Sequence, residues 1–270
     1  MEEILKRFAS GNLSIEEAAR ELKLDGIRRL GEFAKIDLNR QYRAGIPEIV
    51  FAEGKKSADV ADIALAHATA KGFALISRAS HEDAAEIETK NSIAEEDLEV
   101  DFNEAANTIL VKKKGYEFLK RGKIGVIAAG TADIPVAEEA RVVAEVCGCE
   151  VLTVYDVGIA GIHRLVKPLE AFVTADVAAV IVVAGMEGAL PSVVASLVDM
   201  PVIGVPTSVG YGMGGKGIAA LLAMLQSCSP GLAVVNIDNG VGAGTFAAKC
   251  VRIRNTNKDG TSPILGTPPT

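Results

Sequence analysis

The amino-acid sequence predicts an α/β protein with a doubly wound, parallel five-stranded sheet and a smaller α/β domain before it. Three observations support this prediction. The 270-residue chain is 49% hydrophobic but only 4% aromatic, a composition typical of buried parallel sheets. From Lys123 onward, five short apolar segments alternate with five helical patterns. Several of the 27 glycines follow these segments, where tight turns or ligand contacts require them.

The first segment of the chain contains two amphipathic helical patterns within residues 3–24, separated by Ser10–Ser14. Ser14 and Glu17 have the spacing of a capping box, in which each side chain caps the backbone of the other residue. We assign residues 1–34 to N-terminal helices. No residue type in this segment points to chemistry.

Residues 35–118 are predicted to form the small α/β domain. A short strand ends at Phe51, a helix runs from Ser57 to Gly72, and a second strand occupies residues 73–77. Residues 82–104 carry ten acidic side chains and one lysine, which indicates a solvated helix and loop. A further strand is expected at residues 108–111.

Residues 119–253 are predicted to form the larger domain. Its strands are expected at residues 124–128, 151–155, 178–184, 202–205 and 232–236. Its helices are expected at residues 134–147, 161–174, 189–198, 214–226 and 242–252. The last residues, 254–270, are rich in Asn, Thr, Gly and Pro, and we predict a disordered tail.

Composition and charge exclude several classes of function. The net charge of −7 and the pI of about 5.2 argue against a nucleic-acid-binding surface. The four cysteines form no C-x-x-C pair, which argues against a zinc site. The apolar segments are too short and too often broken by Gly or Pro to cross a membrane. The start of the chain shows no secretory leader, so we expect a reduced, cytoplasmic protein.

Candidate binding residues lie in the loops that follow the strands, because doubly wound sheets bind ligands beyond the carboxyl ends of their strands. In strand order they are Gly130, Thr131 and Asp133; Asp156, Gly158 and His163; Gly185, Met186 and Glu187; Ser208, Gly210, Tyr211, Gly212 and Lys216; and Asp238 and Asn239. Each polar member also has a structural alternative. Thr131 and Asp133 can cap a helix, and Asp238 and Asn239 can form an Asx-turn. His163 can be a packing residue and Glu187 an exposed loop acid.

Cys228 is the candidate nucleophile. It follows the glycine-rich loop and the next helical pattern, in the segment Gln226-Ser-Cys-Ser-Pro-Gly231. The other three cysteines, Cys147, Cys149 and Cys250, have the settings of buried, inert thiols. A nucleophilic role for Cys228 requires local positive potential or donors that lower the pKa of its thiol.

The C-terminal half resembles the N5-carboxyaminoimidazole ribonucleotide mutase and AIR carboxylase family, which implies a flavodoxin-like, AIR carboxylase-like domain. Gly130-Thr-Ala-Asp133 resembles the family's phosphate-binding loop. Ala189-Leu-Pro191 and Pro201–Pro206 resemble two further family segments. The family has a histidine before Leu-Pro, whereas this chain has Ala189. This departure puts a purine-precursor carboxylase in doubt.

The whole chain resembles the LarB-type pyridinium-3,5-biscarboxylic acid mononucleotide synthases, which begin nickel-pincer cofactor biosynthesis. The resemblance covers residues 40–242. The matching segments are Arg43–Glu48, Glu53–Lys55, Ser77-Arg78, Gly130–Asp133, Tyr155–Gly158, Gly161–Arg164, Gly185–Gly188, Ser208–Gly212, Ser227–Gly231 and Asn236–Gly240. Their number and their order along the chain make the match specific.

The resemblance implies that nicotinic acid adenine dinucleotide is carboxylated by CO2 at ring carbon 5 and that its phosphoanhydride is hydrolysed, giving the biscarboxylated mononucleotide and AMP. Cys228 matches the nucleophile that adds to the ring, and Glu187 matches the carboxylate for the proton step. Glycines 210–217 can provide room and amide donors for CO2. The cations Arg43, Lys55, Arg78 and Lys216 are either ligands of anionic substrate groups or surface charges.

Asp133 and Asp156 are candidates for the hydrolytic step, for which we consider Mg²⁺, and no tightly bound organic cofactor is expected. Related folds assemble as homo-octamers with shared sites, so the same assembly is expected here. Two other functions remain open. One is carboxylation of an aminoimidazole ribonucleotide, and the other is dinucleotide binding without catalysis.

Overall fold

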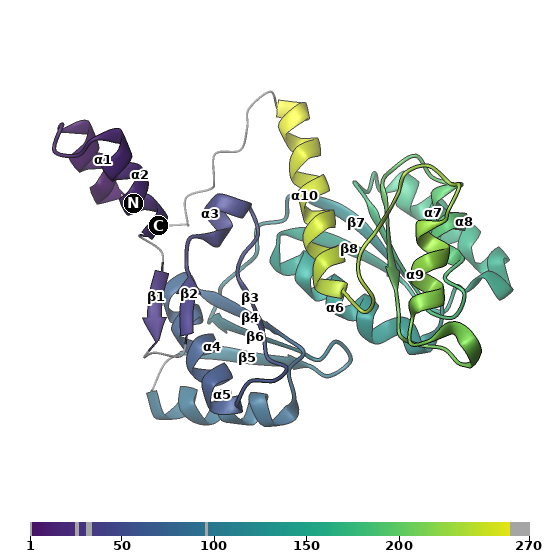
Figure 1. The fold of residues 1–270 in the computed structure, drawn as a ribbon, viewed down its shortest axis with the longest axis horizontal. Helices are drawn as coiled ribbons and strands as arrows, with labels where there is room; N and C mark the ends of the chain where they lie inside the picture. Colours follow the sequence, from purple (N-terminus) through teal and green to yellow (C-terminus); the bar gives the residue numbers. More distant parts are fainter. Residues whose placement is uncertain (1, 25–26, 31–33, 95–96, 260–270) are drawn as a thin grey trace. The chain divides into compact units, whose positions relative to one another are not determined.

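The computed structural model describes residues 2–24, 27–30, 34–94 and 97–259 and divides into two compact units (Figure 1). Unit 1 comprises Met1–Ile76, Ser80–Asp101 and Leu110–Tyr116. Unit 2 comprises Ser77–Ala79, Phe102–Ile109 and the chain from Glu117. Within the described residues, no helix has the length and apolar character needed to span a membrane.

Unit 1 begins with two short helices, followed by a hairpin and most of a four-stranded sheet in the order β3-β4-β6-β5. The helices are α1 (Glu2–Ala9), α2 (Ile15–Leu24), α3 (Arg40–Ala44), α4 (Ser57–Lys71) and α5 (His81–Ala94). The strands are β1 (Ile27–Leu30), β2 (Ala34–Asp37), β3 (Ile49–Phe51), β4 (Phe73–Ser77), β5 (Leu98–Asn103) and β6 (Thr108–Lys113). The Ser14–Glu17 capping box is confirmed, because each side chain bonds the other residue's backbone N–H, at 3.1 and 2.9 Å.

Two expectations for this half of the chain were wrong. Residues 1–34 are not all helical, because β1 pairs antiparallel with β2 and the hairpin crosses the expected boundary. Each of these strands has four residues, too few to show a convincing alternation in sequence. The acidic segment 82–104 contains β5 as well as a helix. In β5, the apolar residues Leu98, Val100 and Phe102 alternate with other side chains, as in a strand. The high acidic content of the segment hid this alternation.

Unit 2 confirms the predicted five-stranded, all-parallel sheet, with strand order β11-β10-β9-β7-β8. When the five strands are numbered 1 to 5 along the chain and read from β8 to β11, their order is 2-1-3-4-5. This is the flavodoxin-like arrangement. The strands are β7 (Gly122–Ala128), β8 (Cys149–Val154), β9 (Val180–Ala184), β10 (Val202–Pro206) and β11 (Leu232–Val234). The α-helices are α6 (Ile134–Val146), α7 (Val166–Thr174), α8 (Leu190–Ala195), α9 (Ile218–Leu225) and α10 (Gly240–Asp259). Short 3₁₀ turns, η1 (Thr131–Asp133), η2 (Ile159–Leu165) and η3 (Gly212–Gly214), lie in the connecting loops.

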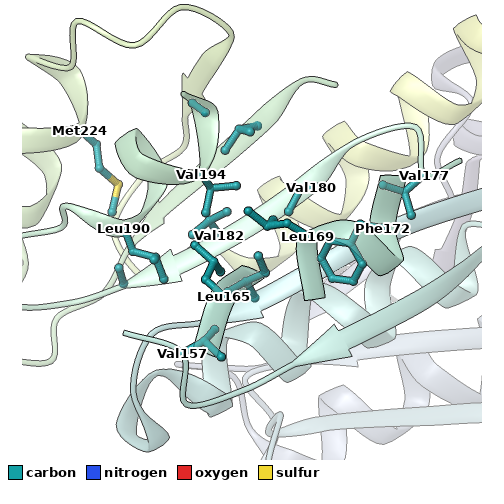
Figure 2. Close-up of a cluster of buried hydrophobic side chains, with 14 of the residues drawn as sticks. Val157, Leu165, Leu169, Phe172, Val177, Val180, Val182, Leu190, Val194 and Met224 are labelled. Carbon is teal, nitrogen blue, oxygen red and sulfur yellow. The ribbon is translucent and has the colours of Figure 1, made fainter. Parts of the chain in front are cut away.

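Helices cover both faces of this sheet. Helices α6 and α10 pack together against one face, and α7, α8 and α9 cover the other (Figure 1). Figure 2 shows Leu169 and Phe172 of α7 near Val180 and Val182 of β9, in a cluster that also contains Leu190, Val194 and Met224 of α8 and α9. Every residue of β9 and β10 is buried, as expected for strands covered on both faces. This core fixes the strands, and therefore the loops at their ends.

The predicted disordered tail was wrong over residues 254–259, because α10 extends to Asp259. The Arg254 guanidinium donates to the backbone carbonyls of Asp176 and Val177, both at 3.0 Å, and pairs with the Asp176 carboxylate. The side-chain amide of Asn255 donates to the carbonyl of Arg121 at 2.6 Å. These bonds to distant residues extend the helix beyond the point at which composition predicts disorder. Residues 260–270 lie outside the described part of the chain.

Glu138 on α6 provides a test of stability against pH. Burial acts to raise its pKa, but hydrogen bonds from Arg141, Tyr155 and Asn103 outweigh that effect and lower the pKa to about 2, from an ordinary 4.5. A depressed pKa contributes stability above the unfolded-state pKa, and this contribution is lost as the pH falls from about 4.5 towards 2. Glu138→Gln is expected to lower the free energy of unfolding by about 1–3 kcal/mol at pH 7 and by much less near pH 2.

Chemical denaturation at pH 7, 4 and 2.5 measures this difference. Glu150→Gln is the control, because Glu150 is an exposed acid whose partner Lys123 is 3.6 Å away and also exposed. An exposed pair of this kind contributes little to stability. If Glu138→Gln lowers the free energy of unfolding by the same amount at all three pH values, the ionic role of this carboxylate is contradicted.

Candidate functional site

The Asp133 carboxylate joins three loops at the carboxyl edge of the sheet in unit 2. Its Oδ1 accepts a hydrogen bond from the Thr207 hydroxyl at 2.6 Å, and its Oδ2 accepts from the Gly130 backbone N–H at 2.9 Å. The backbone N–H of Gly185 also bonds this carboxylate. Burial raises the pKa of Asp133, although these three donors oppose the rise. Asp133 therefore ties together the loops that follow β7, β9 and β10.

Asp238 connects the loop after β11 to the same edge. Its Oδ1 accepts from the Ser208 backbone N–H at 2.8 Å, and its own N–H donates to the Pro206 carbonyl at 2.9 Å. Met186 donates its N–H to the Val209 carbonyl at 2.9 Å, which links the loops after β9 and β10. The structure thus brings together the predicted residues around Gly130, Gly185, Ser208 and Asp238.

Backbone strain also concentrates in these loops. Seven described non-glycine residues have positive φ, and five of them are predicted site residues: Arg78, Asp156, Met186, Lys216 and Asp238, with φ between 47° and 58°. Such conformations cost about 1–3 kcal/mol each and persist where the surroundings enforce them. Their concentration in the predicted binding loops is an observation independent of the hydrogen bonds, and it favours a functional site.

Gly185 leaves no space for a side chain. A Cβ atom there would lie 2.4 Å from the Val209 carbonyl oxygen and 2.6 Å from the Thr207 hydroxyl. Gly185→Ala is therefore expected to displace the loop after β10 and lower the free energy of unfolding by about 1–3 kcal/mol. Gly130→Ala is the control, because its Cβ would meet only the Asp133 carboxylate at 3.5 Å, and its φ of −124° suits alanine. Equal losses in the two variants by chemical denaturation would contradict this account.

The glycine-rich loop between β10 and α9 turns through η3. Gly217 has φ +90°, and a Cβ there would lie 2.8 Å from the Thr207 carbonyl oxygen. This end of the loop therefore packs against Thr207, a member of the Asp133 cluster (Asp133 with its partners Gly130, Gly185 and Thr207). Tyr211, Gly212 and Lys216 are exposed along this loop, as is Gly210 at its start. The loop is therefore both anchored to the carboxyl edge and open to solvent.

The loop after β8 takes less part in the cluster. Gly158 packs against the Ala129 carbonyl oxygen, which would lie 3.1 Å from a Cβ. Asp156 is exposed and pairs with Arg164 at 2.8 Å, and His163 is exposed within η2. Thr131 is also exposed, in η1 beside Asp133. Of the side chains predicted here, none is buried against the Asp133 carboxylate.

Glu187 and Asn239 lie at the starts of helices. Glu187 is exposed in the turn between β9 and α8, and Met186 beside it is 42% exposed. The Asn239 side-chain oxygen accepts the Gly242 backbone N–H at 2.7 Å, so Asn239 caps α10, the structural alternative for this residue. Glu187 is thus accessible to a ligand at the edge of the sheet, whereas Asn239 is engaged by its own helix.

Arg43 and Lys55 belong to unit 1, where each has a partner. Arg43 pairs with Asp37, and this contact lowers the pKa of the Asp37 carboxyl. The Lys55 ammonium donates to the Phe51 carbonyl and lies 5.8 Å from the centre of the Phe51 ring. Their predicted role as substrate ligands stays a prediction.

Cys228 lies at the opposite, amino-terminal edge of the same sheet. It precedes β11, whose first residue, Leu232, pairs with Val202 at the start of β10. The Gly231 carbonyl accepts the Val202 N–H at 3.0 Å. The five residues of β10 span about 13 Å from this edge to the Asp133 cluster. Within one chain, therefore, the structure does not bring Cys228 to the predicted binding loops.

Exposure nevertheless distinguishes Cys228 from the other three cysteines. It is exposed, whereas Cys149 is buried and Cys147 and Cys250 are partly buried. Burial raises the pKa of the Cys147 thiol to about 12 and that of Cys149 to about 11, and it also raises the pKa of Cys250. These three thiols are therefore poor nucleophiles at neutral pH.

The two carboxylates considered for Mg²⁺ are already engaged. Asp133 accepts three hydrogen bonds, and Asp156 pairs with Arg164. Across the described ranges, no group of three or more His, Cys, Asp or Glu side chains has the arrangement of a metal site. The described residues of one chain therefore show no preformed magnesium site, and we derive no step through a magnesium ion.

Two buried residues of this edge were missed by sequence reasoning. Thr207 is the hydroxyl partner of Asp133, and Glu139 of α6 is a buried carboxylate bonded to Ser77. Thr207 directly precedes the segment Ser208–Gly212. This position in the sequence was the signal that could have identified it as a site residue. Glu139 lies among Ala137, Ala140 and Val143 on the buried face of α6, where an acid is unusual.

Comparison with known proteins matches both halves of the chain. A family model described as AIR carboxylase matches residues 123–260, and one described as the LarB/PurE-like N-terminal domain matches residues 27–113. An uncharacterized protein of Methanocaldococcus jannaschii is 46% identical over 260 residues, covering 94% of this chain and 97% of that protein.

Relatives that are named for an activity match the C-terminal half of the chain. The N5-carboxyaminoimidazole ribonucleotide mutase of Methanocaldococcus jannaschii is 34% identical over 137 residues, covering 50% of this chain and 82% of the mutase. The mutase of the same name from Thermotoga maritima is 31% identical over 139 residues, covering 49% of this chain and 76% of the mutase.

The doubly wound fold, the loops at its carboxyl edge and these matches define an α/β enzyme of the carboxylase/mutase type, with an AIR carboxylase-like C-terminal domain. The N-terminal match narrows this class. The chain belongs to the LarB family.

Proposed function

We propose that this protein carboxylates ring carbon 5 of nicotinic acid adenine dinucleotide with CO2 and hydrolyses the phosphoanhydride, giving pyridinium-3,5-biscarboxylic acid mononucleotide and AMP, the first step of nickel-pincer cofactor biosynthesis. The observation that carries the proposal is the exposure of Cys228, which lies in the segment Ser227–Gly231 that resembles the family, whereas the other three thiols are buried or partly buried. Membership of the LarB family supports the choice of substrate.

The chemistry requires a nucleophile because ring carbon 5 of a pyridinium ion does not attack CO2. The Cys228 thiolate adds to ring carbon 4 and forms a dihydropyridine, in which carbon 5 is an enamine carbon. Carbon 5 then attacks CO2. Glu187 removes the proton from carbon 5, and the electron pair restores the aromatic ring as the carbon–sulfur bond breaks. Water cleaves the phosphoanhydride in a separate step that releases AMP.

The substrate's anionic groups suit the carboxyl edge of unit 2. The phosphate-loop match at Gly130–Asp133 lies there, as do Ser208, Asp238 and the cations Arg78 and Lys216. The glycine-rich loop adjoins this cluster and supplies amide donors for the new carboxylate. Arg43 and Lys55 are further proposed ligands of anionic groups.

Because Cys228 and these loops occupy opposite edges of one sheet, we propose that a second copy of the chain supplies Cys228 to each site, within a homo-octamer. Helix α9 lies between the glycine-rich loop and Cys228, and its Ile218, Leu222 and Leu225 are 50–61% exposed along one face. Neighbouring apolar side chains of this kind are typical of a protein contact. Light scattering of the purified protein measures the assembly, and a monomer at micromolar concentration would contradict it.

The alternative function is that of the mutase relatives, a carboxylation of an aminoimidazole ribonucleotide. The AIR carboxylase match favours this alternative. Ala189 argues against it, because alanine occupies the position of the family's histidine and has no group that can carry a proton.

The experiment incubates the purified protein with nicotinic acid adenine dinucleotide and labelled bicarbonate. Formation of AMP together with label in a pyridinium product is expected. Turnover of N5-carboxyaminoimidazole ribonucleotide instead would support the mutase alternative. Tight binding of the dinucleotide without product would show a binding protein and contradict the proposed reaction.

A further inference from the structure

Glu139 is a buried carboxylate that the proposed reaction does not use. Its side chain is 4% exposed, and its Oε1 accepts from the Ser77 hydroxyl at 2.9 Å and lies 3.5 Å from the Arg78 Nε. The backbone N–H groups of Gly240 and Val241, at the start of α10, also bond it. The carboxylate therefore joins the end of β4, helix α6 and the start of α10 within unit 2.

The surroundings of Glu139 are built for a carboxylate. Burying an ionisable group costs free energy that an apolar side chain of similar volume would not. Burial accordingly raises the pKa of Glu139, against the opposing effects of Ser77 and Arg78. Gly240 allows the close approach, since a Cβ there would lie 2.7 Å from the Glu139 Oε2. The burial of Glu139 is unfavourable in free energy, and the adjacent glycine leaves space for its carboxylate. Together these features point to a role beyond packing.

Arg78 connects this carboxylate to the carboxyl edge. Its backbone is strained, with φ of 56°. Its Nη2 donates to the carbonyl of Asp238, the residue whose side chain accepts the Ser208 N–H. Its Nε forms an ion pair with Glu139, so the guanidinium has two partners. Among the described contacts, its Nη1 is not used, and the side chain is 37% exposed.

The start of α10 would otherwise be the natural place for an anion, because helix N-termini offer free N–H groups and a positive dipole end. Here Glu139 already occupies its first N–H groups. An anionic ligand at this edge must therefore find its positive partner elsewhere, and the guanidinium of Arg78 is adjacent.

We propose that Glu139 is a positioning residue that fixes the Arg78 guanidinium at the carboxyl edge, so that Arg78 binds an anionic oxygen group of the substrate, a phosphate or the ring carboxylate. The identity of this ligand rests on the proposed function. The positioning of Arg78 by Glu139 does not.

The positioning is tested by the reaction of Arg78 with phenylglyoxal in the full-length protein, measured by peptide mass spectrometry. Glu139→Gln is expected to raise the rate at Arg78 about fivefold, the effect of losing the ion pair with this buried carboxylate. Glu138→Gln is the matched control, because it removes the neighbouring acid on α6, whose partners are Arg141, Tyr155 and Asn103. Arg164, paired with Asp156, is the internal reference. An unchanged rate at Arg78 in Glu139→Gln would overturn the positioning.

The ligand role is tested by a double-mutant cycle on the Kd for nicotinic acid adenine dinucleotide, measured by calorimetry. Arg78→Ala is expected to weaken binding about tenfold or more, and Glu139→Gln about fivefold. In the Arg78→Ala background, Glu139→Gln should cause no further loss beyond about twofold, because both changes remove the same interaction. If Glu139→Gln weakens binding equally in the wild-type and Arg78→Ala backgrounds, Glu139 acts only on stability, and the proposal is overturned. The melting temperatures of Glu139→Gln and Glu138→Gln are compared to detect a loss of stability that both substitutions cause.

Two further ligands identify the anionic group. NAD lacks the ring carboxylate, so an Arg78→Ala loss confined to nicotinic acid adenine dinucleotide assigns Arg78 to that carboxylate. Equal losses for both dinucleotides assign it to a phosphate. A wild-type protein that binds the dinucleotide but forms no product contradicts the proposed reaction alone, whereas the phenylglyoxal rates test Glu139 whatever the substrate is.

Discussion

Replacement of Cys228 by alanine is expected to lower the incorporation of labelled CO2 into the pyridinium product by about 1,000-fold or more, because the ring cannot become nucleophilic without thiolate addition. Folding should be unaffected, since Cys228 is exposed in the loop between α9 and β11. The measurement is product label against time, with circular dichroism to confirm the fold. Cys250→Ala is the control, because it removes a partly buried thiol whose pKa is raised by burial.

Iodoacetamide provides an independent measurement on the wild-type protein. Because the other thiols are buried or partly buried, alkylation is expected at Cys228 first and should abolish label incorporation in parallel. Full activity of an enzyme alkylated at Cys228, or of Cys228→Ala, would remove this residue from the mechanism.

Replacement of Glu187 by glutamine is expected to lower product formation by about 10²–10⁴-fold, because an amide cannot take the proton from carbon 5. Addition of Cys228 to the ring does not need this base, so a covalent adduct should accumulate. Intact-protein mass spectrometry detects this adduct, which should be missing from the Cys228→Ala, Glu187→Gln double variant. Glu170→Gln, an exposed acid on α7, is the control. Normal turnover in Glu187→Gln would assign the proton step to another group.

The two variants together also test the shared site. Co-expression of Cys228→Ala with Glu187→Gln produces assemblies in which a site can combine the intact Glu187 of one copy with the intact Cys228 of another. We expect a measurable part of the activity to return. Mixed assemblies as inactive as the separate variants would mean that both residues act within one copy, which the distance between the two edges of the sheet opposes.

The strand-end loops of unit 2 were predictable because apolar segments alternate with helical patterns, and because parallel strands share a carboxyl edge. Gly130, Gly185, Ser208 and Asp238 were located in this way. The same rule applied to Cys228 places it at the other edge, since it precedes β11 rather than following a strand. Its nearness in sequence to the glycine-rich loop was therefore misleading, because α9 separates the two along the sheet.

In unit 1, local signals sufficed for the capping box at Ser14 and for helix α4, which ends at Lys71 with Gly72 as its C-cap. They failed for β1 and β2, since each of these strands is stabilised by the other and carries little pattern alone. They also failed for the end of α10, where bonds from Arg254 to residues 77 and 78 positions earlier override a disorder-prone composition.

By itself, the sequence determined the fold class, the order of the elements in unit 2 and the positions of the strand-end loops, because the burial of apolar residues gives strands and helices characteristic spacings that can be read locally. Only the tertiary structure decided the partners of the buried carboxylates. Asp133 meets Thr207 across 74 residues, and Glu139 meets Ser77 across 62. No local pattern encodes such pairs, because they form only when packed strands and helices bring distant segments within hydrogen-bonding distance.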